Sequence, residues 1–153
     1  MIAQLLHRFH TLHISRIVHI PPVGMNSQHY FLNAVAFVET TVSRTELKQY
    51  CNQIETALGR DREDPNSKFK DRPADIDILA AMSLPEERKR TARELTDEYF
   101  LYPLIDELIA FLTATAPPTT LQAGVSLQLD NLTFGETATT IHWNGNASQK
   151  RVV

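Results

Sequence analysis

Two aspartates separated by one residue are the part of this sequence best suited to hold a metal ion. Asp75 and Asp77 fall in segment 74–80, where small or apolar residues occupy the intervening positions. This alternation predicts a β-strand, in which side chains two apart share one face at about 7 Å. Carboxylates that close repel each other unless a positive charge lies between them, and Mg²⁺ binds through one or two carboxylates plus substrate phosphates. The pair therefore predicts a magnesium site; the alternative is an exposed strand face balanced by surface lysine and arginine.

Arginines precede the two aspartates at several positions. Arg72 lies just upstream of them, and Arg60 and Arg62 begin the preceding loop. The planar guanidinium group suits the oxygens of phosphate. Glu55 falls near the end of the helix before that loop, close enough in sequence to join the same site. Carboxylates for a metal and arginines for phosphate together predict a nucleotide-dependent transferase.

A helix and a long loop must position these side chains. Ser43 and Glu46 form a capping-box pattern, an apolar stripe at helical spacing follows, and Gly59 supplies a C-terminal stop. Residues 60–73 are polar and charged, and ordered loops of this length are commonly functional. Phe69 is expected either to close with this loop over a substrate or to anchor it. Acidic residues nearly cancel the basic ones in the loop, so we expect no nucleic-acid partner.

The remaining pattern predicts helices interleaved with strands. A short amphipathic helix is expected at the N-terminus. Strands are expected over 14–20, ended by two prolines, and over 30–41, whose apolar density predicts a central, doubly covered position. Helices are expected from Ser83, which begins a second capping box, and from Pro103; one or two edge strands are expected after residue 119. This order favours the α+β class, a ferredoxin-like α/β sandwich with an antiparallel-rich sheet and helices packed on it.

Size and composition favour one domain. The chain has 153 residues, 42% of them hydrophobic, and a formal net charge of −3. These values fit a single core and argue against a disordered or strongly basic chain. We expect one domain over residues 1–143 and a flexible tail over 144–153. A single cysteine, no signal-peptide pattern and no apolar run of about 20 residues predict a cytoplasmic protein that does not enter a membrane.

Five short motifs follow one another along the chain. They are Pro22-Val23-Gly24, Tyr30-Phe31-Leu32-Asn33-Ala34, Gln53-Ile54-Glu55-Thr56-Ala57-Leu58-Gly59-Arg60, Asp71-Arg72-Pro73-Ala74-Asp75-Ile76-Asp77-Ile78-Leu79 and Phe100-Leu101-Tyr102-Pro103-Leu104. Each is weak alone, but in this order they resemble the 6-hydroxymethyl-7,8-dihydropterin pyrophosphokinases of folate synthesis. The resemblance extends from about Leu5 to Leu108.

The resemblance implies an enzyme that transfers pyrophosphate from ATP to the hydroxymethyl group of the pterin and releases AMP. It implies that Asp75 and Asp77 hold two Mg²⁺ ions that bridge the ATP phosphates. Three arginines would neutralise charge as the β-phosphorus is attacked: Arg60, Arg62 and Arg72. The partners implied are therefore ATP and a pterin substrate, with Mg²⁺ as the cofactor.

The same resemblance assigns the substrate contacts. Asn33 would read the edge of the pterin, and Phe31 and Tyr99 would stack on its ring. Glu55 would help to orient the site. Phe69, on the long loop, would help to close it over the substrates.

The sequence also departs from the family pattern. The family's central first strand, with its Gly-Ser-Asn turn, has no match, because this sequence starts in the region that resembles the following helix. Asp97 takes the approximate place of a family arginine. Two further expectations follow: a homodimer in which a second copy completes the sheet, or a divergent, non-catalytic module of the same fold that binds pterin or nucleotide or serves assembly.

Overall fold

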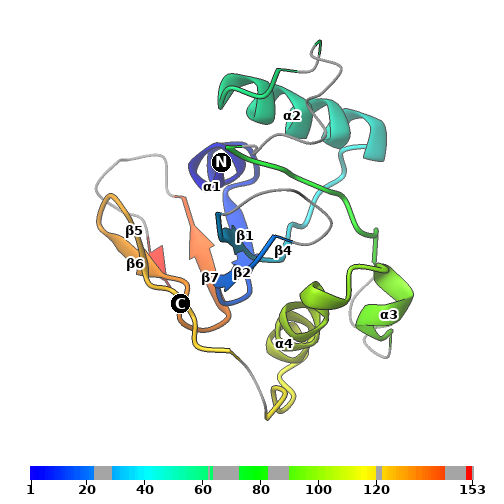
Figure 1. The fold of residues 1–153 in the computed structure, drawn as a ribbon, viewed down its shortest axis with the longest axis vertical. Coiled ribbons are helices and arrows are strands. Elements are labelled where there is room, and N and C mark those ends of the chain that lie inside the picture. The colour runs from blue at the N-terminus through cyan, green and yellow to red at the C-terminus, as the bar shows by residue number, and fades with distance from the viewer. Residues whose placement is uncertain are drawn as a thin grey trace.

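Short antiparallel sheets lie between helices in this α+β chain (Figure 1). The computed structural model describes residues 1–22, 29–61, 63, 73–82, 90–119, 122–143 and 151–152. Three predicted site residues lie outside these ranges: Arg62, Phe69 and Arg72. The start of the helix expected from Ser83 also lies outside them.

The helices of the described residues are α1 (Ile2–Phe9), α2 (Arg44–Ala57), α3 (Ala92–Leu95) and α4 (Tyr102–Leu112), with a short 3-10 helix, η2 (Tyr99–Leu101), before α4. In Figure 1, α1 and α2 lie above the strands, and α3 and α4 lie below them. None of the helices in the described part of the chain is long and apolar enough to cross a membrane.

Local signals set the ends of these helices as expected. The Ser43 N–H donates to Glu46 Oε2 (3.1 Å) and the Glu46 N–H donates to Ser43 Oγ (3.3 Å), which completes the capping box of α2. Gly59, at φ 100°, reverses the chain after α2. Pro103 lies in the first turn of α4, where its missing N–H costs no helical bond.

Every strand pair of the described residues is antiparallel. One sheet has the order β4 (Ala36–Phe37), β1 (Thr11–Ile14), β7 (Thr139–His142), β8 (Arg151–Val152). Two hairpin sheets join β2 (Val18–Ile20) to β3 (Phe31–Asn33) and β5 (Leu127–Leu129) to β6 (Leu132–Phe134). The prediction of edge strands in the tail was wrong for β7, which lies between β1 and β8 because Thr11 to Ile14 pair along its whole length.

Two predicted strands are each broken, and both breaks lie at the same place. The run 14–20 ends as β1 at Ile14 and resumes as β2, while 30–41 divides into β3 and β4. At the break, the Ser15 N–H donates to the Val35 carbonyl (2.9 Å) and the Val35 N–H donates to Ser15 Oγ (3.0 Å). The central, doubly covered position predicted for 30–41 was wrong, because β4 forms a sheet edge and β3 pairs only with β2 among the described residues.

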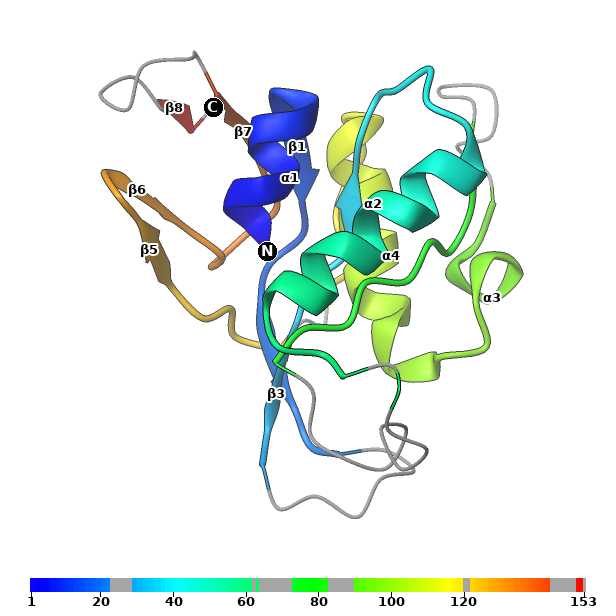
Figure 2. The ribbon, with the colours of Figure 1, turned by 90° about the horizontal axis from the view of Figure 1, so that it is seen from above.

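The strand predicted over 74–80 was also wrong as a paired strand. The segment alternates as expected, with Ala74 buried and Asp75 and Asp77 exposed, yet it pairs with no strand of the described residues. Figure 2 shows it running alongside α2. The alternation sets only the directions of side chains, whereas pairing requires a neighbouring strand within hydrogen-bonding distance.

Two apolar clusters and one buried ion pair hold the elements together. The first cluster packs Leu6 of α1 against β1, β7 and the β5–β6 hairpin. The second packs β2 against α3, η2 and α4. Between them, buried Glu107 of α4 accepts from the Arg16 backbone N–H (3.0 Å), from Arg16 Nε (3.0 Å) and from the Ala138 N–H (3.3 Å). This ion pair fixes α4 to the break between β1 and β2.

Candidate active site

A buried carboxylate at the end of α2 organises the candidate site. The Glu55 side chain is 0% exposed, and its Oε2 accepts a hydrogen bond of 2.6 Å from Arg60 Nη1. The same Nη1 donates to Asp75 Oδ1 at 2.9 Å. Arg60 reaches back to the helix because the chain turns at Gly59, and its own N–H donates to the Glu55 carbonyl (3.0 Å). A buried charge is tolerated when it is paired and hydrogen-bonded, so Glu55, Arg60 and Asp75 form one linked unit.

Side chains of α2 make the hydrogen bonds to the backbone of segment 74–80 that a neighbouring strand would make in a sheet. Glu55 Oε1 accepts from the Ile76 N–H (2.7 Å), Lys48 Nζ donates to the Ile76 carbonyl (3.3 Å), and Arg44 Nη2 donates to the Ile78 carbonyl (3.3 Å). Arg44 and Lys48 are four residues apart and therefore neighbours on one face of the helix. These bonds satisfy backbone groups that a sheet would otherwise satisfy.

The two aspartates point outward from this segment. Their side chains are 44% and 59% exposed for Asp75 and Asp77, and each carries a cation on its Oδ1 atom. For Asp75 the cation is Arg60, and for Asp77 it is Lys48, whose Nζ lies 3.2 Å away. Two accessible carboxylates two residues apart are oxygen donors of the kind that Mg²⁺ prefers.

A fuller set of protein ligands is not seen around them. Within the described ranges, no group of three or more histidine, cysteine, aspartate or glutamate side chains is arranged to hold a metal. Mg²⁺ keeps several waters and takes other ligands from substrate phosphates. The donor set of Asp75 and Asp77 therefore fits an ion that arrives with a nucleotide.

Glu98 adds negative charge that the sequence did not predict for this site. It precedes η2, far from the aspartates in sequence. Burial raises the pKa of the Glu98 carboxyl, and the nearby charges of Asp77 and Asp75 act in the same direction. The only sequence signal was its place next to Asp97 and Tyr99, and spacing along the chain does not reveal which carboxylates approach each other in space.

The predicted pterin contacts come from two elements. Phe31 pairs with Ile20 and Asn33 with Val18, so both lie on the face of β3 that matches the buried face of β2. Asn33 Nδ2 donates to the Phe31 carbonyl (3.2 Å), which orients the side chain along the strand.

Tyr99 lies on the other element, at the turn before α4. It is 65% exposed and packs edge-on against Phe100, with ring centroids 5.8 Å apart. Phe100 and Leu101 belong to the same apolar cluster as β2. β3 is linked to this cluster by its pairing with β2, and Tyr99 by its neighbours in the chain. Hydrogen bonds, by contrast, unite Glu55 and Arg60 with Asp75 directly.

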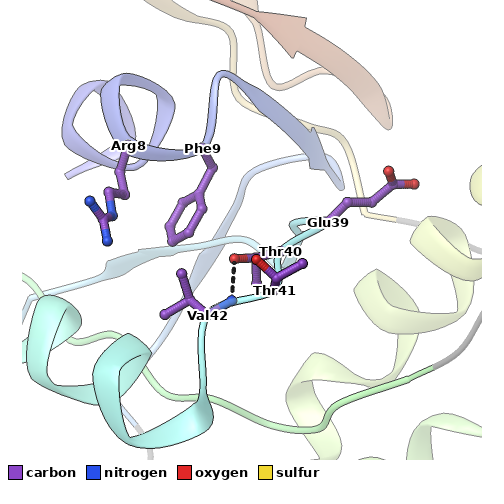
Figure 3. Close-up of a pocket in the computed structure, with 6 residues that line it drawn as sticks. All are labelled: Arg8, Phe9, Glu39, Thr40, Thr41 and Val42. Atoms are coloured by element: carbon purple, nitrogen blue, oxygen red, sulfur yellow. Dashed lines mark hydrogen bonds between the residues drawn. The ribbon is translucent and has the colours of Figure 1, made fainter.

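Two hollows in the surface lie away from these residues. One of about 490 Å³ is lined by Arg8, Phe9 and residues 39–42, between the end of α1 and the start of α2. In Figure 3 the dashed line in this hollow marks the Val42 N–H donating to Thr40 Oγ1 (3.1 Å). The other, of about 460 Å³, lies beside the C-terminal end of α4. Neither is lined by a predicted site residue of the described ranges, so the site rests on the contacts described above.

Fold and site define an α+β protein with a carboxylate and arginine cluster suited to phosphate chemistry. The chain belongs to the 7,8-dihydro-6-hydroxymethylpterin-pyrophosphokinase family, whose model matches residues 1–107. This match confirms the resemblance in the motifs and covers every predicted site residue.

Relatives called 2-amino-4-hydroxy-6-hydroxymethyldihydropteridine pyrophosphokinase share part of the sequence. The Porphyromonas gingivalis protein is 35% identical over 75 residues, which are 49% of this chain and 51% of the relative. The Bacillus subtilis protein is 39% identical over 66 residues, 43% of this chain and 38% of the relative. The Methylorubrum extorquens protein is 42% identical over 60 residues, which are 39% of this chain and 36% of the relative. The chain thus spans about half or less of the length of these relatives, and no solved structure matches it with significance.

Proposed function

We propose that this chain transfers pyrophosphate from ATP to 6-hydroxymethyl-7,8-dihydropterin in folate biosynthesis, with Mg²⁺ as the cofactor. The observation that carries the proposal is the linked unit of Glu55, Arg60 and Asp75, which lies inside the span that matches the family model. A buried glutamate that fixes one arginine beside an exposed aspartate serves to position charge.

The metal would be held by Asp75 and Asp77, and we propose two Mg²⁺ ions shared with the ATP phosphates. When bound, Mg²⁺ neutralises phosphate charge and fixes the orientation of the nucleotide. The protein contributes the placement of the two carboxylates, which Glu55 secures through the N–H of Ile76 between them. Arg60 places its guanidinium charge beside Asp75, where it would face the phosphates.

The reaction would join the hydroxymethyl oxygen of the pterin to the β-phosphorus of ATP. The bond from that phosphorus to the oxygen bridging the α- and β-phosphates would break, AMP would leave, and the hydroxyl proton would be released. We propose that Arg60, Arg62 and Arg72 stabilise the charge on the transferring group. Asn33 would bind the pterin edge, Phe31 and Tyr99 its ring face, and Phe69 would close the loop.

A direct assay tests this function. ATP, Mg²⁺ and 6-hydroxymethyl-7,8-dihydropterin should yield AMP, and Asp75→Ala and Asp77→Ala should each remove it. Asp106→Ala, at an exposed position on α4, is the matched control and should keep the wild-type rate. AMP formation that survives both aspartate substitutions would move the metal site elsewhere, and no AMP at high protein concentration would refute catalysis by this chain.

A second candidate function is a non-catalytic module that keeps the pterin contacts. It is favoured by two observations: Lys48 forms an ion pair with Asp77, and segment 74–80 is held by side chains outside the described sheets. Calorimetry separates the two candidates. A module would bind pterin without Mg²⁺-dependent nucleotide binding, whereas the enzyme should bind both, and a chain that binds neither would refute both.

We also propose a homodimer in which a second copy completes the sheet, because β4 lies at an edge of the four-stranded sheet of the described residues. Sedimentation at micromolar concentration should show a dimer, and a clean monomer would refute it.

A cytoplasmic location is proposed because the chain's one cysteine, Cys51, is buried as a free thiol in α2.

A further inference from the structure

Lys48 contacts the aspartate segment at two points. Its Nζ donates to the Ile76 carbonyl at 3.3 Å and to Asp77 Oδ1 at 3.2 Å. The Lys48 side chain is 44% exposed, so it can leave these partners for solvent at little cost. Arg44 lies one turn earlier on the same helix face. The bond described for it in this segment goes to the Ile78 carbonyl.

The two aspartates are therefore balanced by unlike cations. Arg60 is only 16% exposed and is fixed by Glu55, whereas Lys48 is a compact charge on a flexible chain. Arg60 can stay in place when phosphates arrive, since a guanidinium group adds favourable charge there. An ammonium group on Asp77 Oδ1 takes one of the two carboxylate oxygens and competes with a divalent ion for the same negative charge.

We propose that Lys48 is an internal counter-ion of Asp77 that holds this carboxylate in place before the metal binds and competes with the metal for it. The proposal rests on the proposed function, because it takes Asp77 as a metal ligand. Binding of Mg²⁺ with nucleotide then requires the Lys48–Asp77 ion pair to open, while the Arg60–Asp75 pair persists. Lys48 is therefore a positioning residue whose ion pair with Asp77 lowers the affinity of the site for the metal.

The substitution Lys48→Met tests this proposal, because it keeps the aliphatic stem and removes the charge. The measurement is the affinity for Mn²⁺ in the presence of a non-hydrolysable ATP analogue, followed by electron paramagnetic resonance of the free ion. We expect binding to tighten about two- to fivefold, the fold-change that corresponds to an exposed ion pair. The control is Arg44→Met, which removes a cation from the same helix face; the Arg44 bond described goes to a carbonyl and not to a carboxylate. This variant should keep the Mn²⁺ affinity within about twofold of wild type.

The direction of the change separates competition from a purely structural role. A variant that merely loosened segment 74–80 would bind the metal more weakly, so weaker or unchanged binding by Lys48→Met would overturn the proposal. If Lys48→Met does not fold, Lys48→Gln removes the charge and keeps an N–H donor, and the same gain is expected. Wild-type protein that binds no Mn²⁺ with the nucleotide would refute the proposed function itself, and the inference with it.

Discussion

Replacing Glu55 with glutamine tests the central claim about the site. The substitution keeps the shape of the side chain and one oxygen for the Ile76 N–H, but it removes the charge that faces Arg60. An amide group in that place would also direct N–H donors toward the guanidinium donors. The change therefore removes the charge of one buried ion pair and keeps the size of the side chain.

The expected magnitude follows from the burial of the two partners. Breaking a buried pair by removing one partner costs about 3–5 kcal/mol. Glu55 is 0% exposed, but Arg60 is 16% exposed and keeps Asp75, so part of the cost is recovered. We expect a loss of about 2–3 kcal/mol in the free energy of unfolding, which for a chain of this size lowers Tm by roughly 5–10 °C.

Thermal unfolding followed by circular dichroism measures this loss, with Glu136→Gln, the same change at an exposed position, as the control. AMP formation should fall as well, because Arg60 loses the carboxylate that fixes its guanidinium group beside Asp75. If Glu55→Gln melts with the control and keeps full turnover, the buried pair neither stabilises the fold nor positions the site, and the reasoning fails.

Three further predictions concern other parts of the chain. Glu107→Ala should lower the free energy of unfolding by about 3–5 kcal/mol, since it leaves Arg16, whose side chain is only 15% exposed, without its carboxylate partner. Asp106→Ala, at the exposed neighbouring position, should change it by less than about 0.5 kcal/mol. The hydrogen bonds from Ser43 hold the pKa of the Glu46 carboxyl below 4.5. The charged carboxylate therefore stabilises the fold fully above its unfolded-state pKa, and this stabilisation is lost as the pH falls through its folded-state pKa. Urea unfolding should accordingly show Glu46→Gln less stable than wild type at pH 7, with the difference closing below pH 4.5; a difference that persists in acid would contradict the capping charge. Burial lowers the pKa of His13 below 6.5, so the free energy of unfolding should fall as the pH is lowered and the ring becomes charged. An NMR titration midpoint at or above 6.5 would contradict this prediction.

Features encoded by neighbouring residues were predictable from the sequence. The start of α2 depends on Ser43 and Glu46, three residues apart, and its end depends on Gly59. The alternation over 74–80 correctly placed Asp75 and Asp77 on the side opposite buried Ala74. Such features follow from bonds and directions within one or two turns of chain.

Features that depend on contacts between distant segments were not predictable. Segment 74–80 has a strand pattern, but whether it pairs depends on what lies beside it. The break at Ser15 depends on Val35, twenty residues away, and on Glu107 of α4. The approach of Glu98 to the aspartates likewise arises from tertiary packing, for which a single sequence gives no periodic signal.

The attachment of segment 74–80 to α2 has a consequence for how this protein tolerates sequence change. In a sheet, backbone ladders hold a strand whatever its neighbour's side chains are, so neighbouring positions can drift by mutation. Here the backbone bonds at Ile76 and Ile78 are made by the side chains of Arg44, Lys48 and Glu55. Genetic variation at Glu55 of α2 would therefore shift the aspartates directly. A deep mutational scan should find Glu55 as constrained as the aspartates' own segment, and Arg44 and Lys48, whose bonds to this segment are longer, more tolerant.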